Sequence, residues 1–148
     1  MRNPLSRAYQ NFGGDPDSSI PWIIWLLENP DSPISLGGAI DLRRHDYLHI
    51  LFNRGTSLED EAFVIGVTMG NDANTNRFHY WVFKYASRYL YPKKYRFEKA
   101  HFSAFDQGVK IGSSLRVKNL NQLDFSYMDE VNVESLRKLF GIQLQTTN

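Results

Sequence analysis

The sequence predicts an all-α fold, a single mostly helical domain of about five to six helices that includes a metal-binding helical hairpin. Apolar residues recur at helical spacing along several segments, and these segments end at capping residues, glycines or prolines. A chain of 148 residues, with 42% hydrophobic and 22% charged residues, has the size and composition of one globular domain with a sizeable core. We expect a flexible N-terminal arm over residues 1–17 and one helical domain over residues 18–148.

Composition narrows the class of protein. A net charge of +1 gives no overall attraction to nucleic acid, and we expect no nucleic-acid partner. The chain has no cysteine, which excludes disulfides and thiolate metal sites. The first residues lack the apolar core of a signal peptide, and no stretch is long enough to span a membrane. We therefore expect a cytoplasmic protein, with association at a membrane surface left open.

Two kinds of helix are expected. Residues 20–27 are strongly apolar, and the helix expected there ends before Pro30. Its two tryptophans suit either burial in the core or contact with a membrane surface or an apolar pocket. The longer helices are expected over about residues 37–53, 57–69, 77–90, 97–108 and 132–141. Gly108 and Gly112 are interpreted as a helix end and a turn.

The third of the longer helices has an aromatic pattern. Its large side chains recur at helical intervals: Phe78, Trp81, Val82, Tyr85 and Tyr89. Aromatic residues then alternate with bases over residues 89–97, as they do in single-strand nucleic-acid binders and in membrane-facing segments. We interpret that stretch as a solvated connection between helices, because charge runs are usually solvated.

The pattern HDxxH-x11-E is the strongest functional signal. Counted at about 100° per residue, His45, Asp46 and His49 share one face of a helix. A turn at Gly55 then leads into the next helix, and Glu61 stands as far beyond that glycine as His49 stands before it. If the two helices run back antiparallel, all four side chains can meet at one point.

Glu61 also lies on the apolar stripe of its helix, formed by Leu58, Ala62, Ile65 and Met69. A buried carboxylate is costly unless it is paired or bound to metal. Two imidazoles and two carboxylates, from His45, Asp46, His49 and Glu61, suit zinc best and also accommodate manganese, ferrous iron or magnesium. The alternative is a buried salt-bridge or hydrogen-bond cluster that joins the two helices.

These residues resemble a known family. The complete HDxxH-x11-E motif is similar to the signature of the ubiquinone (coenzyme Q) biosynthesis family, the complex-organising coenzyme Q protein four family. Residues 104–108 look like its AYxRG helix, and residues 133–142 resemble its closing helix. The resemblance covers about residues 20–142, and the chain would be a shortened relative.

The resemblance implies a helical protein that binds a divalent metal and holds a prenylated or other hydrophobic lipid. It also implies peripheral membrane contact, other quinone-biosynthesis enzymes as partners, and a metal-dependent oxidative decarboxylation of a prenylated ring precursor. A homodimer is left open. The alternative is a non-catalytic lipid-binding scaffold with a structural metal, because four protein ligands would nearly fill a tetrahedral ion.

Overall fold

A computed structural model describes residues 3–12, 42–73, 75–89, 93, 96–120 and 123–144. Within these residues the chain forms six α-helices and one 3₁₀ helix with no strand, which confirms the all-α fold. The apolar segment 20–27 and its two candidate roles lie outside the described residues. The elements are α1 (Leu5–Phe12), α3 (Leu42–Leu51), α4 (Leu58–Asn71), α5 (Arg77–Tyr89), α6 (Lys99–Ser114), η3 (Phe125–Met128) and α7 (Val133–Phe140).

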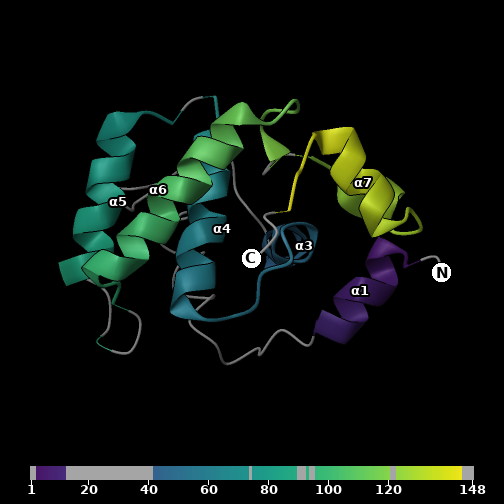
Figure 1. Cartoon of the computed structure of the whole chain (residues 1–148), viewed down its shortest axis with the longest axis horizontal. Coiled ribbons are helices and arrows are strands. Elements are labelled where there is room, and N and C mark those ends of the chain that lie inside the picture. The colour runs from purple at the N-terminus through teal and green to yellow at the C-terminus, as the bar shows by residue number, and fades with distance from the viewer. Residues whose placement is uncertain are drawn as a thin grey trace.

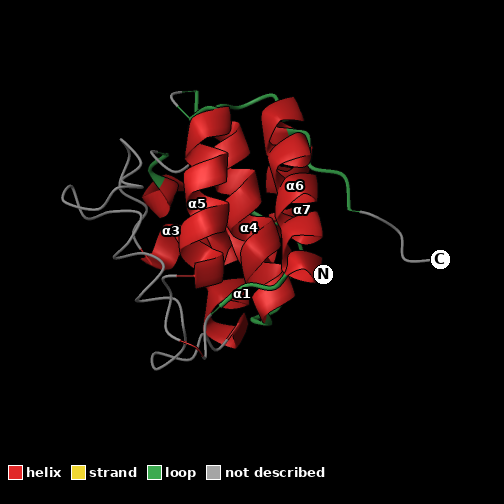
Figure 2. Cartoon of the chain, turned by 90° about the vertical axis from the view of Figure 1, so that its left-hand side faces the viewer, coloured by secondary structure: helices red, strands yellow, loops and turns green. Residues whose placement is uncertain are grey.

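The helices gather on two sides of α3 (Figure 1). In this view helices α4, α5 and α6 lie on one side of it, and α1 and α7 lie on the other. Figure 2 shows the same helices from the α5 end. In Figure 1 α3 is seen along its own axis whereas α4 runs across the view, so these two helices cross. Helices α3 and α4 therefore do not run antiparallel, which was the condition for all four side chains of the motif to meet at one point.

Among the described helices, α4 and α6 pack most closely, and glycines allow their backbones to approach each other. A Cβ atom built on Gly66 would lie 2.2 Å from the carbonyl oxygen of Phe105, and one on Gly108 would lie 2.1 Å from that of Phe63. Cβ atoms built on Gly70 and Gly112 would likewise lie 2.3 and 2.2 Å from carbonyl oxygens of the facing helix. Our interpretation of Gly108 and Gly112 as a helix end and a turn was therefore wrong. Both lie inside α6, where two small-residue stripes let the backbones touch.

Helix α1 occupies part of the predicted flexible arm. Leu5 is fully buried, its N–H donates to the carbonyl of Val131 at 3.0 Å, and the ring of Tyr9 packs edge-on against Tyr47 of α3 at 5.3 Å. Residues 4–12 therefore contact the rest of the fold, because one apolar face of this short amphipathic helix packs against residues far along the chain. The domain boundary after residue 17 stays a prediction, since residues 13–41 lie outside the described part.

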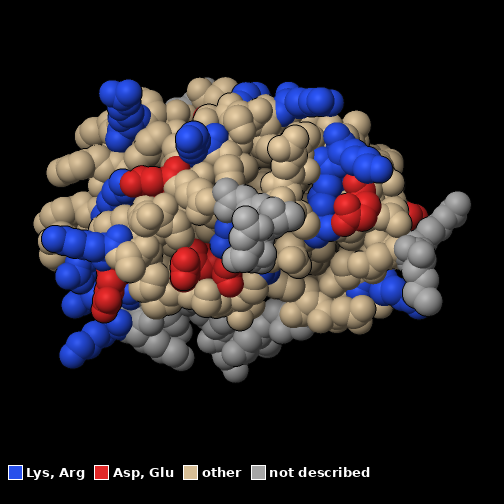
Figure 3. Space-filling model, viewed as in Figure 1, with Lys and Arg blue, Asp and Glu red and all other residues tan. Residues whose placement is uncertain are grey.

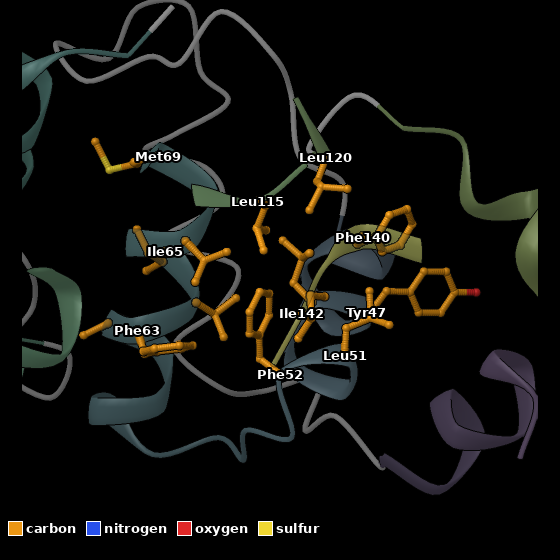
Figure 4. Close-up of a cluster of buried hydrophobic side chains, with 14 of the residues drawn as sticks. Tyr47, Leu51, Phe52, Phe63, Ile65, Met69, Leu115, Leu120, Phe140 and Ile142 are labelled. Carbon is orange, nitrogen blue, oxygen red and sulfur yellow. The ribbon is translucent and has the colours of Figure 1, made fainter. Parts of the chain in front are cut away.

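One hydrophobic core runs between the two sides, as Figure 4 shows. It draws on helices and on the segments that follow α6 and α7, through Tyr47, Leu51, Phe52, Phe63, Ile65, Met69, Leu115, Leu120, Phe140 and Ile142. None of the described helices combines the length and the apolar character that crossing a lipid bilayer requires. The core therefore holds α3 between its neighbours, and α3 carries the predicted metal-binding histidines.

Candidate metal centre

Helix α3 presents His45 and His49 one turn apart, and both are buried, at 2% and 0% exposure. Two backbone bonds turn the chain at its end, from the N–H of Asn53 to the carbonyl of Ile50 and from the N–H of Arg54 to the carbonyl of His49. Asn53 takes a left-handed conformation with φ of 54°, which asparagine tolerates better than most residues.

The guanidinium group of Arg137 in α7 also fixes the end of α3. Its Nε donates to the carbonyl of Leu51 at 2.8 Å, and its Nη2 donates to the carbonyl of Ile50 at 2.9 Å. The last carbonyls of a helix have no partner within the helix, so a side chain from elsewhere satisfies them here. Arg137 therefore holds the last turn of the helix that carries the histidines.

The hydrogen bonds at the start of α4 determine where along the helix Glu61 lies. Ser57 is the N-cap, and its hydroxyl oxygen accepts the N–H of Asp60 at 3.1 Å. The Asp60 carboxylate in turn accepts the N–H of Gly55 at 3.2 Å and the hydroxyl of Ser57 at 3.0 Å. The turn is thereby closed on itself, and Glu61 follows in the first turn of α4, fully buried.

Three ligand atoms converge between α3 and α4. Oε2 of Glu61 lies 2.9 Å from Nε2 of His45 and 3.3 Å from Nε2 of His49, and the two Nε2 atoms lie 3.0 Å apart. The centroids of the two imidazole rings are 4.7 Å apart, and the ring planes are inclined by 72°. Three of the four predicted ligands therefore form a buried group whose atoms could hold a metal ion.

The spacing fits a metal better than a hydrogen-bond network. Two ligand atoms bound at about 2.0–2.1 Å to one tetrahedral zinc ion stand roughly 3.3 Å apart, close to the separations found here. Each Nε2 carries at most one hydrogen and an ionised carboxylate carries none, so at most two hydrogens serve three close pairs. A single cation among the three atoms leaves no such mismatch. Oε1 of Glu61 is also buried without a hydrogen-bond partner.

The two acids of the motif respond differently to burial. Burial favours the neutral form of Glu61, but hydrogen bonds to His45 and His49 and their charges outweigh it and lower the pKa of Glu61 to about 2. For Asp46, burial is the largest effect and raises the pKa despite the opposing charges of the two histidines. Glu61 is therefore the carboxylate that is held ionised in this site.

Asp46 is placed differently from the other three. It is buried, at 4% exposure, and its Oδ1 has no hydrogen-bond partner. Its carboxylate is not among the converging atoms, which belong to His45, His49 and Glu61. In this geometry three protein ligands surround the point of convergence, so a tetrahedral ion would keep one position open.

A cavity of about 460 Å³ adjoins the site on the side of His49. It lies between α1, the end of α3 and the start of α7, and most of its lining side chains are polar. The lining comprises Asn3, Ala8, Asn11, Phe12, His49, Ile50, Asn53, Arg54, Asn132, Val133, Glu134 and Arg137. No local pattern predicts this cavity, because its walls come from three segments far apart along the chain, within residues 3–12, 49–54 and 132–137.

Comparison with known proteins adds no relative: no protein-family model, no curated protein and no solved structure matches the chain. Of the resemblance stated from the motif, the structure shows the buried group of His45, His49 and Glu61 with HxxxH…E spacing. A buried group of two histidines and a glutamate that could hold a metal ion is thus the functional feature that the described residues support.

Proposed function

We propose that this chain is a divalent-metal protein, with zinc the first choice of ion, that holds the acidic ring of a prenylated aromatic precursor of an isoprenoid quinone. The observation that carries the proposal is the convergence of His45 Nε2, His49 Nε2 and Glu61 Oε2 in a buried position. The ring carboxylate and the adjacent hydroxyl are the groups that an ion in this position would bind. The quinone assignment itself comes from the resemblance of the HDxxH-x11-E motif.

The charge of the ligand set favours an anionic substrate. Two neutral imidazoles and one carboxylate around a dication leave a net charge of about +1. A carboxylate on the substrate would neutralise that charge in a site where burial makes uncompensated charge costly. When bound, the ion would also polarise the carboxylate and stabilise the negative charge that develops as the carbon–carbon bond breaks.

The cavity beside His49 suits the aromatic ring of the proposed precursor better than its prenyl tail. Its amide and guanidinium groups, from Asn11, Asn53, Asn132 and Arg54, offer hydrogen bonds to carboxyl and hydroxyl oxygens. A long isoprenoid chain exceeds a cavity of about 460 Å³, which has room for the ring. We therefore place only the ring in this cavity, with the prenyl tail leading outward.

The test combines metal analysis with ligand binding. Protein purified without added metal should contain about one equivalent of a divalent ion per chain, and Glu61→Gln should reduce that content. His79→Ala is the matched control, because His79 lies outside the converging group and should leave the metal content unchanged. A short-chain prenylated hydroxybenzoate should bind to the metal-loaded protein and not to the chelated protein. Absence of metal would overturn the site, and metal without ligand binding would overturn the quinone assignment.

The second candidate is a scaffold in which the ion only joins α3 to α4. The complete burial of His49 and Glu61 favours it, because closed structural sites are buried. Turnover lost in a Glu61→Gln variant that still folds would support chemistry. Lipid binding retained in that folded variant, with a lower melting temperature as the change observed, would support the scaffold.

A further inference from the structure

Helix α5 carries a row of large aromatic side chains that face solvent. Phe78, Trp81, Tyr85 and Tyr89 are 65%, 64%, 50% and 60% exposed. They are spaced by three, four and four residues, so they share one face of the helix. The opposite face is buried through Phe83, which is fully covered. The aromatic pattern that predicts this helix from the sequence therefore belongs largely to its outer side.

Three of the exposed rings contact one another in a row, and Phe78 lies one turn before them on the same face. We call these four residues the α5 aromatic face (Phe78, Trp81, Tyr85 and Tyr89). Trp81 and Tyr85 are stacked, with centroids 5.9 Å apart and planes inclined by 19°. Tyr85 and Tyr89 follow at 5.2 Å. Isolated exposed aromatics are ordinary, but a contiguous apolar patch on a surface usually marks a contact site.

Positive charge borders the α5 aromatic face. Helix α5 contains Arg77, Lys84 and Arg88 and no acidic residue, and these three bases fall on one flank of the aromatic row at about 100° per residue. Lys84 pairs with Asp106 of α6 at 2.6 Å. Figure 3 shows several lysine and arginine side chains, with acidic side chains among them, at the end of the molecule where Figure 1 places α5.

Exposed aromatic rings flanked by basic residues favour one kind of binding partner over the others. A second copy docked through the same face would bring two sets of bases together without an acid on either helix, and like charges repel. Single-stranded nucleic acid binds in positively charged grooves with bases stacked on separate rings, whereas this face is the outer side of a helix whose rings already stack on each other. Aromatic rings flanked by bases match the headgroup region of a bilayer with anionic lipids.

We propose that the α5 aromatic face, flanked by Arg77 and Arg88, docks the protein onto the surface of a bilayer that contains anionic lipids. Trp81 and Tyr85 enter the headgroup region with their rings, and the two arginines contact lipid phosphates. Contact at the surface needs no spanning segment. The docking site lies on α5, and the metal ligands lie on α3 and α4, so the two sites can be tested separately.

The test is vesicle flotation with the full chain. Wild-type protein should bind vesicles of phosphatidylcholine mixed with phosphatidylglycerol, and bind vesicles of phosphatidylcholine alone much more weakly. Trp81→Ser combined with Tyr85→Ser should weaken binding roughly 100-fold, because two rings lose their burial in the interface. Arg77→Gln combined with Arg88→Gln should weaken it about 25-fold on the anionic vesicles and remove most of the salt dependence.

Tyr127→Ser combined with Leu139→Ser is the matched control, because both side chains are highly exposed but lie outside α5. This variant should bind vesicles as wild type does, and all three variants should keep the wild-type melting temperature. Three results would overturn the proposal: equal loss in the control, equal binding to neutral and anionic vesicles, or no vesicle binding. Loss of self-association or of oligonucleotide binding in the α5 variants, with vesicle binding intact, would also overturn it in favour of the other occupant.

Discussion

Gly108 of α6 lies directly against the backbone of α4, and we expect Gly108→Ala to destabilise the fold. A Cβ atom at this position would stand 2.1 Å from the carbonyl oxygen of Phe63, 3.0 Å from its carbonyl carbon and 2.9 Å from the nitrogen of Val67. All three neighbours are backbone atoms, which cannot rotate away as a side chain would. Ordinary contact begins at 3.4 Å, so the helices must separate locally by about 1.3 Å.

Two effects of opposite sign set the magnitude. Alanine favours a helix interior over glycine by about 1 kcal/mol, which stabilises the variant. Overpacking that forces backbone shifts costs typically about 1–3 kcal/mol, and a displacement of this size belongs at the upper end. We expect a net loss of about 2 kcal/mol in the free energy of unfolding. For a chain of this length that lowers the melting temperature by roughly 6 °C.

Urea denaturation followed by circular dichroism measures this loss as a lower midpoint with an unchanged slope. Ser113→Ala in the same helix is the control, because Ser113 is exposed and its loss should change the free energy of unfolding by less than about 0.5 kcal/mol. A Gly108→Ala variant as stable as wild type, or more stable, would refute the close approach of α4 and α6.

Three further predictions concern the site and its supports. A chelator should lower the melting temperature of wild type by roughly 8 °C when metal was present at about 100 times its dissociation constant, and should leave Glu61→Gln unchanged; equal shifts would refute metal linkage. Asn71→Ala should cost about 3 kcal/mol in urea denaturation, because the buried Leu120 N–H and Val117 carbonyl lose their partners; a cost below about 1 kcal/mol would contradict this. Arg137→Lys should cost about 1–2 kcal/mol and weaken zinc binding severalfold in a titration, because lysine lacks the fork that holds the last carbonyls of α3; unchanged affinity would argue against this support.

Local sequence patterns were sufficient to predict the two helices of the hairpin, α3 and α4. The apolar stripe through Ala62 and Ile65 depends only on residues within one or two turns, and both side chains are buried in the structure. His45 and His49 share a face at any helical spacing of four. The inward position of Glu61 followed from the stripe, and its full burial confirms it. Only the crossing of the helices needed information from the rest of the fold.

Features that depend on contacts between distant segments were not predicted from the sequence, for physical reasons. A glycine near the end of an apolar pattern usually indicates a C-cap, so α6 was expected to end at Gly108. The glycines at matching spacing in α4, Gly66 and Gly70, show instead that close approach requires them, and that reading depends on knowing which helices are neighbours. Helical periodicity likewise predicts α5 but does not say which side faces water. Each of these errors concerns a partner that local sequence does not name.

The position of the metal centre bears on how its role can be tested. Helix α3 is held to α1 by Tyr9 against Tyr47, and to α7 by Arg137. Helix α4 is held to α6 through the glycine contacts, so the site stands where these two groups of helices meet. An ion at that junction will stabilise the fold whether or not it also binds substrate, because it binds only the folded arrangement. A lower melting temperature after metal removal is therefore expected under both proposals. Only turnover or ligand binding, measured in variants that still fold, separates a catalytic ion from a structural one.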